Sequence, residues 1–327
     1  MLSQALDLVL TSFGIIRSKV DEVISFDVAK NVKSQWIFFK AFQNPYQKRF
    51  RVSAIDSGYN YREFRGYALY IQNTVWVAID VDGSESSSGV VDIDVTSSSN
   101  IDYELSLLST IREMDSVCNL VNNFDIVLVD GSLIAVFSKI RRALLEGSGE
   151  LLQSKNINIK DSLNNFLITL SLYPSKIVFI SKNSTAKDVL GLVKGDIYYF
   201  ERYTDGLPGY TKPLDLTKSR HIGIAAAAKT FSHTIKNVTG LSSTIYMSYV
   251  RFEPFSRIYR VEFVSEKGED VEQRIRHLIN TLSSYIVTGY PYPLMRADQI
   301  ARISYDDVDR VAIVLGISSD PYDREPL

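Results

Sequence analysis

The sequence has few residues of the two types that most often bind transition metals, because its 327 residues include one cysteine and three histidines. The single cysteine, Cys118, excludes a disulfide framework and a cysteine-based metal site. It lies in an apolar helical pattern, which favours a buried structural role. The histidines, His221, His233 and His277, have no spacing typical of metal ligands, and we interpret them as ordinary residues.

The sequence also lacks an excess of either charge, since 36 basic residues face 38 acidic ones and the net charge is -2. Any contact with nucleic acid therefore requires basic residues that are gathered on one surface. Hydrophobic residues make up 45% of the chain and charged residues 23%, as in ordinary globular proteins. The length allows one α/β domain with appended arms or two average domains.

No segment approaches the roughly 20 uninterrupted apolar residues that a transmembrane helix needs. The first twenty residues are partly apolar, but Gln4, Asp7 and Arg17 interrupt them and no small-residue cleavage site follows. We therefore expect a cytoplasmic protein with no membrane contact.

The N-terminal residues predict an amphipathic helix that extends to about Val28. Its apolar positions recur at helical spacing: Leu2, Leu6, Val9, Leu10, Phe13 and Ile16. A helix of this kind needs an apolar partner surface, which a second protomer, another protein or the domain itself could supply. We expect it to serve association.

Three β-rich runs follow, and the turn formers between them predict an antiparallel three-stranded meander. The runs are Val52–Asp56, Phe64–Ile71 and Val75–Val81, joined at 57–60 and 72–74. The next stretch, 83–100, is dense in serine and aspartate, so we interpret it as a surface excursion.

Helical and strand patterns then alternate. Helices are predicted at about 102–122, 137–153 and 159–172, and buried strands at 124–129 and 176–180. Further β-rich runs and helical stretches follow at 244–252, 257–264, 271–285 and 297–315. The order three strands, helix, strand, helix, strand is typical of an RNase H-like α/β fold, in which parallel strands adjoin the meander.

Two aspartates, Asp56 and Asp130, each follow an apolar strand. Taken singly, each is better explained as a turn residue. In the RNase H order, however, the two strands are neighbours, so their carboxylates would repel each other and a divalent cation would relieve the repulsion. Glu113, in the helix between them, shares a face with Val117 and Leu120 and can complete the cluster.

Three hard oxygen ligands favour Mg²⁺ or Mn²⁺ over zinc. Two such ions about 4 Å apart can activate water and stabilise the leaving oxygen of a phosphodiester. Asp80 and Asp82 are rival carboxylates, but they lie on the third predicted strand and its turn, and we interpret them as structural.

Basic residues near the later strands are candidates for contacts with DNA. Lys182 follows the fifth strand and precedes a predicted short helix capped by Ser184, where a phosphate can bind, although a solvated lysine explains the position equally well. Arg251, Arg257 and Arg260 alternate with aromatic residues, a mixture suited to single-stranded DNA. Arginines that extend out of half-buried strands are the structural alternative.

Five short blocks, in this order along the chain, resemble the archaeal NurA nuclease family. They are Ala54-Ile55-Asp56-Ser57-Gly58, Glu113, Val129-Asp130-Gly131-Ser132, Ile180-Ser181-Lys182 and Gly289-Tyr290-Pro291-Tyr292-Pro293-Leu294. The resemblance implies an RNase H-like nuclease domain at 50–316, between an N-terminal helical arm at 1–49 and a tail at 317–327. It also implies Mn²⁺-dependent 5′-to-3′ exonuclease and single-strand endonuclease activity, homodimers, and the processing of single-stranded DNA and duplex ends with the HerA hexameric ATPase.

Position by position, the resemblance makes Asp56, Glu113 and Asp130 ligands of Mn²⁺ or Mg²⁺, in a site of two ions that Tyr290 supports. The family has a histidine eight residues after that tyrosine, where this chain has Asp298. Aspartate is also a ligand of hard cations, so we expect Asp298 to act as a fourth carboxylate. The competing prediction makes Asp298 a helix N-terminal residue that is remote from catalysis.

Two other classes of function are compatible with parts of the pattern. The segment 56–60 resembles the phosphate loop of actin-like and sugar-kinase-like ATPases, but those proteins duplicate the core and no second meander with such a turn is visible. The third hypothesis is a non-catalytic DNA-binding or scaffold subunit, and Asp298 is the only residue that suggests it.

Overall fold

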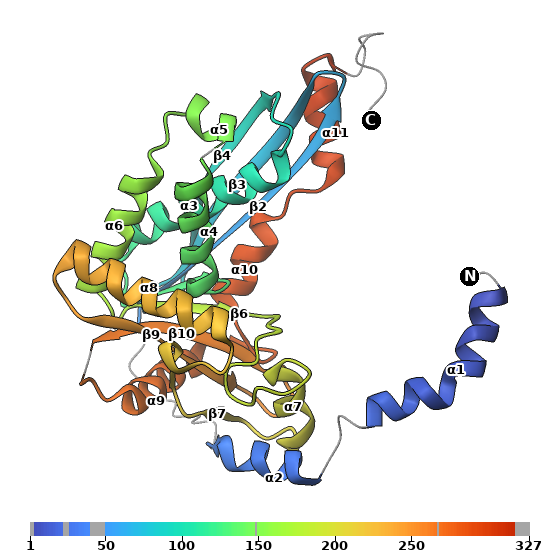
Figure 1. The fold of residues 1–327 in the computed structure, drawn as a ribbon. Helices are drawn as coiled ribbons and strands as arrows, with labels where there is room; N and C mark the ends of the chain where they lie inside the picture. Colours follow the sequence, from blue (N-terminus) through green and yellow to red (C-terminus); the bar gives the residue numbers. More distant parts are fainter. Residues whose placement is uncertain (1–2, 22–25, 40–49, 148, 267, 318–327) are drawn as a thin grey trace.

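The computed structural model describes residues 3–21, 26–39, 50–147, 149–266 and 268–317. Its centre is a ten-stranded mixed sheet in the order β1-β7-β9-β10-β6-β5-β2-β3-β4, with β8 paired to β9, and β11 and β12 form a separate small sheet (Figure 1). The strands are β1 Trp36–Phe38, β2 Val52–Phe64, β3 Tyr67–Ile79, β4 Glu85–Thr96, β5 Ile126–Asp130, β6 Ile177–Ser181, β7 Gly209–Thr211, β8 Leu214–Asp215, β9 Ser243–Arg251, β10 Tyr259–Glu266, β11 Ile286–Val287 and β12 Tyr290–Pro291.

Helices cover both faces of this sheet. They are α1 Ser3–Asp21, α2 Phe26–Gln35, α3 Ile101–Leu120, α4 Leu133–Glu146, α5 Gly149–Ser154, α6 Ile159–Leu172, α7 Asp196–Tyr203, α8 Ile222–Thr239, α9 Val271–Leu282, α10 Tyr292–Ala301 and α11 Tyr305–Val314, with short 3-10 turns at Leu216–Lys218 and Ser283–Tyr285. The predicted α/β class with a mixed sheet is confirmed.

The central strand β5 shows how the two faces are built. Val127 and Val129 point into a core formed with α3, α4, α6 and α8, while Ile126 and Leu128 point into a second core formed with α9 and α10. A strand that is buried on both faces reads as a continuous apolar run, which is why the sequence pattern identified it. Because side chains alternate, the next residue, Asp130, points to the face that α10 covers.

The parallel part of the sheet is β2-β5-β6, with Ile55 opposite Val129 and Asp130 opposite Ile180. The predicted neighbourhood of the first and fourth strands is therefore confirmed. The remaining pairs in the sheet are antiparallel.

The predicted meander exists, but its boundaries were wrong. The segments expected to be turns at 57–60 and 72–74 pair with each other, as Ser57 opposite Thr74 and Gly58 opposite Asn73, so β2 and β3 run through them. The chain reverses instead at Gly66, whose φ of +97° favours glycine. The polar residues at 57–60 and 72–74 form cross-strand pairs and not turns, so their turn propensity led to the wrong boundaries.

The third meander strand is β4, in the stretch expected to be a surface excursion. It pairs with β3 from Glu85 opposite Ile79 to Thr96 opposite Ala68. Most of its side chains are exposed on both faces, including Val91, Ile93 and Val95. The alternation of these three residues with Asp92 and Asp94 was a strand signal that the density of serine and aspartate concealed.

Several predicted helices also differ from those in the structure. The expected helix at 137–153 is α4 and α5, which separate at Gly147 with a φ of +101°, and the one at 297–315 is α10 and α11, where Ser304 caps the second helix. The loop after Ser184 contains no helix, because the Ser184 hydroxyl accepts from the amide of Ala186 in a local turn. Helices α2, α7 and α8 were not predicted, whereas α6 has its predicted bounds.

Helix α10 lies unusually close to β2 at Gly58. A Cβ atom there would lie 2.3 Å from the carbonyl oxygen of Ala301, so only glycine allows this approach. The amide groups of Asn73 and Asn60 donate to the carbonyls of Ile300 and Ile303, at 3.0 and 3.3 Å. These contacts fix the end of α10 across the β2–β3 hairpin.

The N-terminal arm contains α1, which projects away from the body of the molecule (Figure 1). It ends at Asp21 and α2 begins at Phe26, so the single helix expected to reach Val28 is two helices on either side of undescribed residues. Apolar side chains of α1 are largely exposed: Leu6, Leu8, Val9, Leu10, Phe13 and Ile15. Among the described helices, none combines the length and the apolar character that a bilayer span requires.

Candidate metal centre

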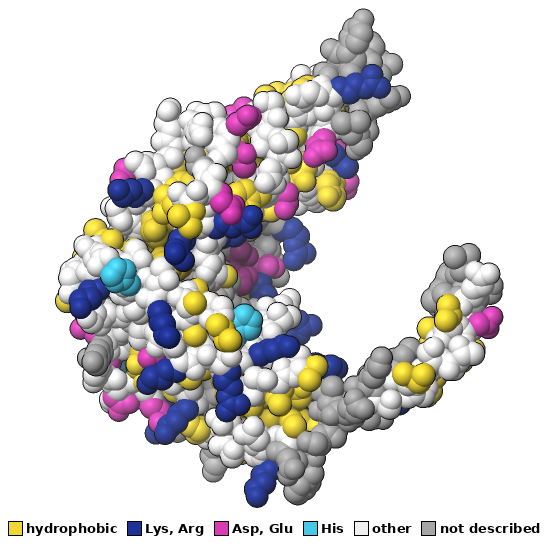
Figure 2. All heavy atoms as spheres, viewed as in Figure 1, with side chains coloured by type: hydrophobic (Ala, Val, Ile, Leu, Met, Phe, Trp, Pro, Cys, Tyr) yellow, Lys and Arg dark blue, Asp and Glu magenta, His cyan; other side chains and the backbone are white. Residues whose placement is uncertain are grey.

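Three aspartates meet on the face of the sheet that α10 covers. Asp56 and Asp130 follow the paired residues Ile55 and Val129 on parallel strands, and Asp298 projects from α10. One carboxylate oxygen from each lies within 4.8 Å of the others. Figure 2 shows acidic side chains in a hollow of the surface, with lysine and arginine side chains around it.

Burial and mutual repulsion disfavour the ionised forms of these carboxyl groups. Burial, followed by the charge of Asp130, raises the pKa of Asp56 to about 7, although the amide of Ser57 donates to it at 2.8 Å. Burial likewise raises the pKa of Asp130. A bound cation would stabilise the ionised forms of these carboxyl groups. Clustered carboxyl groups with raised pKa values are therefore typical of a metal site.

Lys182 offsets part of this charge. Its Nζ lies 2.7 Å from Oδ2 of Asp130, 2.8 Å from Oδ1 of Asp298 and 5.2 Å from the ring centre of Tyr290. Burial lowers the pKa of Lys182, but the two carboxylates outweigh burial and the net shift is upward. One ammonium group cannot neutralise three carboxylates, so the centre stays anionic when all of them are ionised.

Glu113 reaches this region from the opposite face of the sheet, because α3 packs on the other core. Burial and then the charge of Asp56 raise the pKa of Glu113 to about 8, while a hydrogen bond with Ser57 opposes the shift. Glu113 is thus coupled to the centre without belonging to the group of three oxygens. Its role as a ligand stays a prediction.

Tyr290 closes the centre on the side of β10. Its side chain is buried, its ring packs 4.9 Å from the ring of Tyr259, and its hydroxyl has no hydrogen-bond partner among the described residues. Gly289 fixes this position, since its φ is +81° and a Cβ there would lie 2.2 Å from Cβ of Ser256. Burial, Asp130 and Asp56 raise the pKa of the Tyr290 hydroxyl, so it stays a neutral donor.

The residues present fit a hard divalent cation. A buried hydroxyl without a partner costs about 1–3 kcal/mol, and a hydroxide or phosphate oxygen on an ion bound beside it would supply an acceptor. The donor set consists of carboxylate oxygens, which Mn²⁺ and Mg²⁺ prefer. Asp56, Asp130 and Asp298 are the residues placed to hold the ion.

Asp298 lies within α10, which begins at Tyr292, so the competing prediction that it is a helix N-terminal residue is wrong. Its other neighbour is Arg302, whose Nη2 lies 3.2 Å away. Sequence reasoning did not identify Gly58 as a positioning residue. A glycine inside a β pattern was the available signal, because it often marks a close backbone approach.

Of the predicted basic residues, Lys182 bonds two of the aspartates, and Arg257 lines a surface depression that also contains Lys182. Arg251 is buried, and its guanidinium donates to the carbonyl of Ser256 at 2.8 Å and to the hydroxyl of Thr204 at 2.6 Å. Arg260 is also buried and pairs with Asp188 and Glu262. Asp80 and Asp82, interpreted as structural, lie in the β3–β4 turn.

A model of the NurA domain matches residues 50–303 of the chain, which is more than half of its length. The chain belongs to the NurA family.

Relatives in the family have similar length and modest identity. The DNA double-strand break repair nuclease NurA of Sulfolobus acidocaldarius is 26% identical over 312 residues, which cover 90% of this chain and 89% of that protein. The protein of the same name from Saccharolobus solfataricus is 23% identical over 97% of this chain and 96% of its own length.

Solved NurA structures have the same fold. The NurA nuclease from Sulfolobus solfataricus superposes with a TM-score of 0.73 at 20% identity over 97% of both chains. A NurA structure bound to dAMP and manganese gives a TM-score of 0.57 at 12% identity, over 96% of this chain and 98% of that one. The NurA fold is therefore established for this chain.

We predict that Asp56→Asn stabilises the metal-free protein at high pH. A carboxyl group with a raised pKa costs stability as pH rises from its ordinary value near 4 through its folded value of about 7, and asparagine removes that cost. In EDTA, the variant should exceed the parent by at least about 1 kcal/mol in free energy of unfolding at pH 8 and by less at pH 5.

Urea titration at both pH values measures this difference. Asp306→Asn, an exposed carboxylate of α11, is the control and should change the two values equally. A gain from Asp56→Asn that is the same at pH 5 and pH 8 would contradict the assigned repulsion. Mn²⁺ should reverse the ranking, because it stabilises only the parent strongly.

Proposed function

We propose that this chain is a metal-dependent DNA nuclease, and the convergence of Asp56, Asp130 and Asp298 within 4.8 Å carries the proposal. Relatives of similar length are named DNA double-strand break repair nucleases, and one solved structure of the family holds manganese and dAMP. These names support a nuclease of DNA double-strand break repair. The activities we propose for it are 5′-to-3′ exonuclease and single-strand endonuclease, in DNA end processing.

The proposed cofactor is Mn²⁺ or Mg²⁺, as two ions held by the three aspartates with Glu113 as a further carboxylate. Bound ions of this kind supply an activated water and stabilise the leaving oxygen of a phosphodiester. The chain itself orients the carboxylates through the β2–β5 register and the packing of α10. Burial of the centre on the sheet also strengthens every charge interaction there.

In this proposal, Lys182 and Tyr290 bind the substrate. A cation that binds between Asp130 and Asp298 competes with Lys182 for their oxygens, so the ammonium group becomes available to a phosphate. The hydroxyl of Tyr290, which has no hydrogen-bond partner in the part of the chain that the structure describes, is a donor in the same place. Arg251 has its guanidinium bonded within the protein, so we leave it outside the proposed DNA surface.

We further propose an RNase H-like core, with the helical arm at 1–49, the nuclease domain at 50–316 and the tail at 317–327. The β2-β3-β4 meander beside parallel β5 and β6 supports this core. The exposed apolar side chains of α1 support an associating arm, used in a homodimer or against a HerA-type hexameric ATPase.

Removal of residues 1–20 tests the associating arm. The shortened chain should keep its metal-dependent cleavage but lose either dimerisation, measured by light scattering, or binding to the ATPase. If both associations persist unchanged, α1 has no associative role.

The central test is cleavage of single-stranded and duplex DNA with Mn²⁺ by the parent and by Asp56→Ala. The variant should lose at least about 100-fold in rate, because it lacks a ligand whose charge holds the ions. Its circular dichroism should be unchanged. Asp82→Ala, in an exposed turn, is the matched control and should cleave like the parent. Mn²⁺-dependent cleavage retained by Asp56→Ala would refute the assignment.

Asp298 tests whether the fourth carboxylate is functional. Asp298→Ala should raise the Mn²⁺ concentration needed for half-maximal cleavage, whereas Asp298→His should keep activity or raise it, because a neutral ligand repels the scissile phosphate less. Titration of cleavage rate against Mn²⁺ measures both. A slightly lower melting temperature with unchanged metal dependence in Asp298→Ala would exclude the ligand role.

A further inference from the structure

A cavity of about 560 Å³ lies on the face of the sheet opposite the three aspartates. Its floor contains Ser181 of β6 and Arg260 of β10, which are directly paired across the two strands. Its walls are the N-terminal ends of α4 and α8, whose N-cap residues are Ser132 and His221. Neither the metal centre nor its proposed chemistry uses this space.

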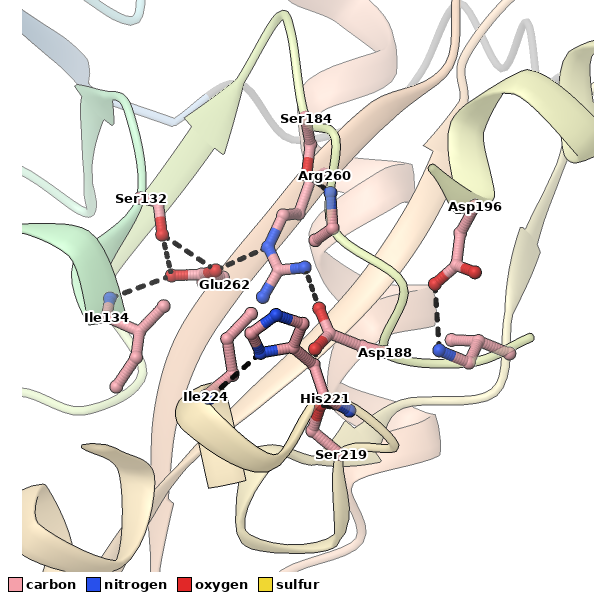
Figure 3. A network of polar contacts seen from close by, with 12 residues as sticks. Ser132, Ile134, Ser184, Asp188, Asp196, Ser219, His221, Ile224, Arg260 and Glu262 are labelled. Carbon is pink, nitrogen blue, oxygen red and sulfur yellow. Dashed lines mark hydrogen bonds and ion pairs between the residues drawn. The ribbon is translucent and has the colours of Figure 1, made fainter. Parts of the chain in front are cut away.

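Two buried donors on the floor of the cavity have no well-directed hydrogen bond to the described residues, although the hydroxyl of Tyr249 lies beside the guanidinium of Arg260. The guanidinium of Arg260 lies between two carboxylates: Nε is 2.5 Å from Oε1 of Glu262, and Nη1 bonds Asp188. Its third nitrogen, Nη2, makes no well-directed hydrogen bond within the described part of the chain, and the hydroxyl of Ser181 has none there either. Figure 3 shows the free end of the guanidinium directed toward His221 and Ile224.

The two carboxylates that pair with Arg260 also accept hydrogen bonds from other protein groups. Glu262 accepts from the hydroxyl of Ser132 at 3.0 Å and from the amide of Ile134 at 3.1 Å, at the start of α4, and Asp188 accepts from Ser219. Neither carboxylate lines the cavity. Their charge is therefore directed at Arg260 and at the N terminus of α4, not at a ligand in the cavity.

The charged side chains that line the cavity are the cations of Lys187 and Arg260, beside hydroxyl groups and apolar side chains such as Ile134. Lys187 lines it and takes part in none of the ion pairs formed by the described residues. Helix α8, of 18 residues, begins there and presents the positive end of its dipole. A buried guanidinium nitrogen, a lysine, hydroxyl groups and a helix N terminus together suit an anion with several acceptor oxygens.

The cavity adjoins the metal centre across the carboxyl edge of the sheet. Side chains alternate along the chain, so Ser181 faces the cavity while the next residue, Lys182, bonds Asp130 and Asp298. A second depression, which contains Lys182, shares Asn183, Ser184 and Thr185 with the cavity. A strand that passes over 183–185 can thus reach both places.

We propose that the cavity between α4 and α8 is a phosphate subsite that holds one phosphate of the DNA strand whose scissile bond lies at the metal centre. This inference rests on the proposed nuclease function. A terminal 5′-phosphate and an internal phosphate have the same recognition chemistry, and the subsite fixes how the strand crosses the edge of the sheet.

Two substitutions probe the subsite without disturbing the buried ion pairs. Lys187→Ala removes one cation, and Ala135→Glu adds a negative charge at an exposed position of α4 that lines the cavity, where the helix dipole tolerates an acid. The matched controls are Lys229→Ala and Ala226→Glu, two exposed positions of α8 outside the cavity lining.

The experiment measures binding of the full chain to single-stranded oligonucleotides, labelled at the 3′ end and carrying a 5′-phosphate or a 5′-hydroxyl, over a salt series in EDTA. Lys187→Ala should weaken binding several-fold and reduce the slope of log K against log salt by about 0.7, the value for one phosphate contact on a single strand. Ala135→Glu should also weaken binding, and both controls should match the parent.

The two oligonucleotides identify the phosphate. A loss confined to the 5′-phosphorylated strand assigns the subsite to a terminal phosphate, and an equal loss on both assigns it to an internal one. Equal binding by Lys187→Ala and Lys229→Ala, together with equal binding by Ala135→Glu and Ala226→Glu, would overturn the subsite. Because no metal is present, that result is independent of cleavage, whereas normal binding without Mn²⁺-dependent cleavage would contradict only the nuclease.

Discussion

The parallel pairing of β2 with β5 is the constraint on which the rest of the site depends. It sets Ile55 opposite Val129. The next residues, Asp56 and Asp130, therefore lie close together on the same face of the sheet. Two half-buried carboxylates in this position are unfavourable without a cation, as the raised pKa values of Asp56 and Asp130 indicate. Packing of the apolar residues of the two strands stabilises the fold and offsets the cost of this repulsion.

The carboxyl edge of the parallel strands divides the chemistry between two faces. On one face, α10 contributes Asp298, and the absence of a side chain at Gly58 allows its close approach. On the other, the first turns of α4 and α8 surround the guanidinium of Arg260. Lys182 and Ser181, adjacent in the chain, belong to different faces because side chains alternate. A single strand end thereby connects the acidic centre to a region of donors.

Asp298 belongs to the acidic centre at the position where the resembled family motif has a histidine. It lies on α10 close to Asp56 and Asp130, and Lys182 bonds it at 2.8 Å. An aspartate there adds a negative charge where the resembled family motif has a neutral imidazole. The lysine and Arg302 offset part of that charge, so the surroundings of Asp298 accommodate it.

The sequence by itself determined the elements whose apolar pattern is strong, such as β5, β6 and α6, and the aspartates that follow the first residues of β2 and end β5. The tertiary structure decided the length of the β2–β3 hairpin, because polar residues such as Ser57 and Thr74 are satisfied across the strands and not in turns. It also decided that Arg251 and Arg260 are buried, and which aspartates meet. Such placements depend on long-range packing, which local periodicity does not encode.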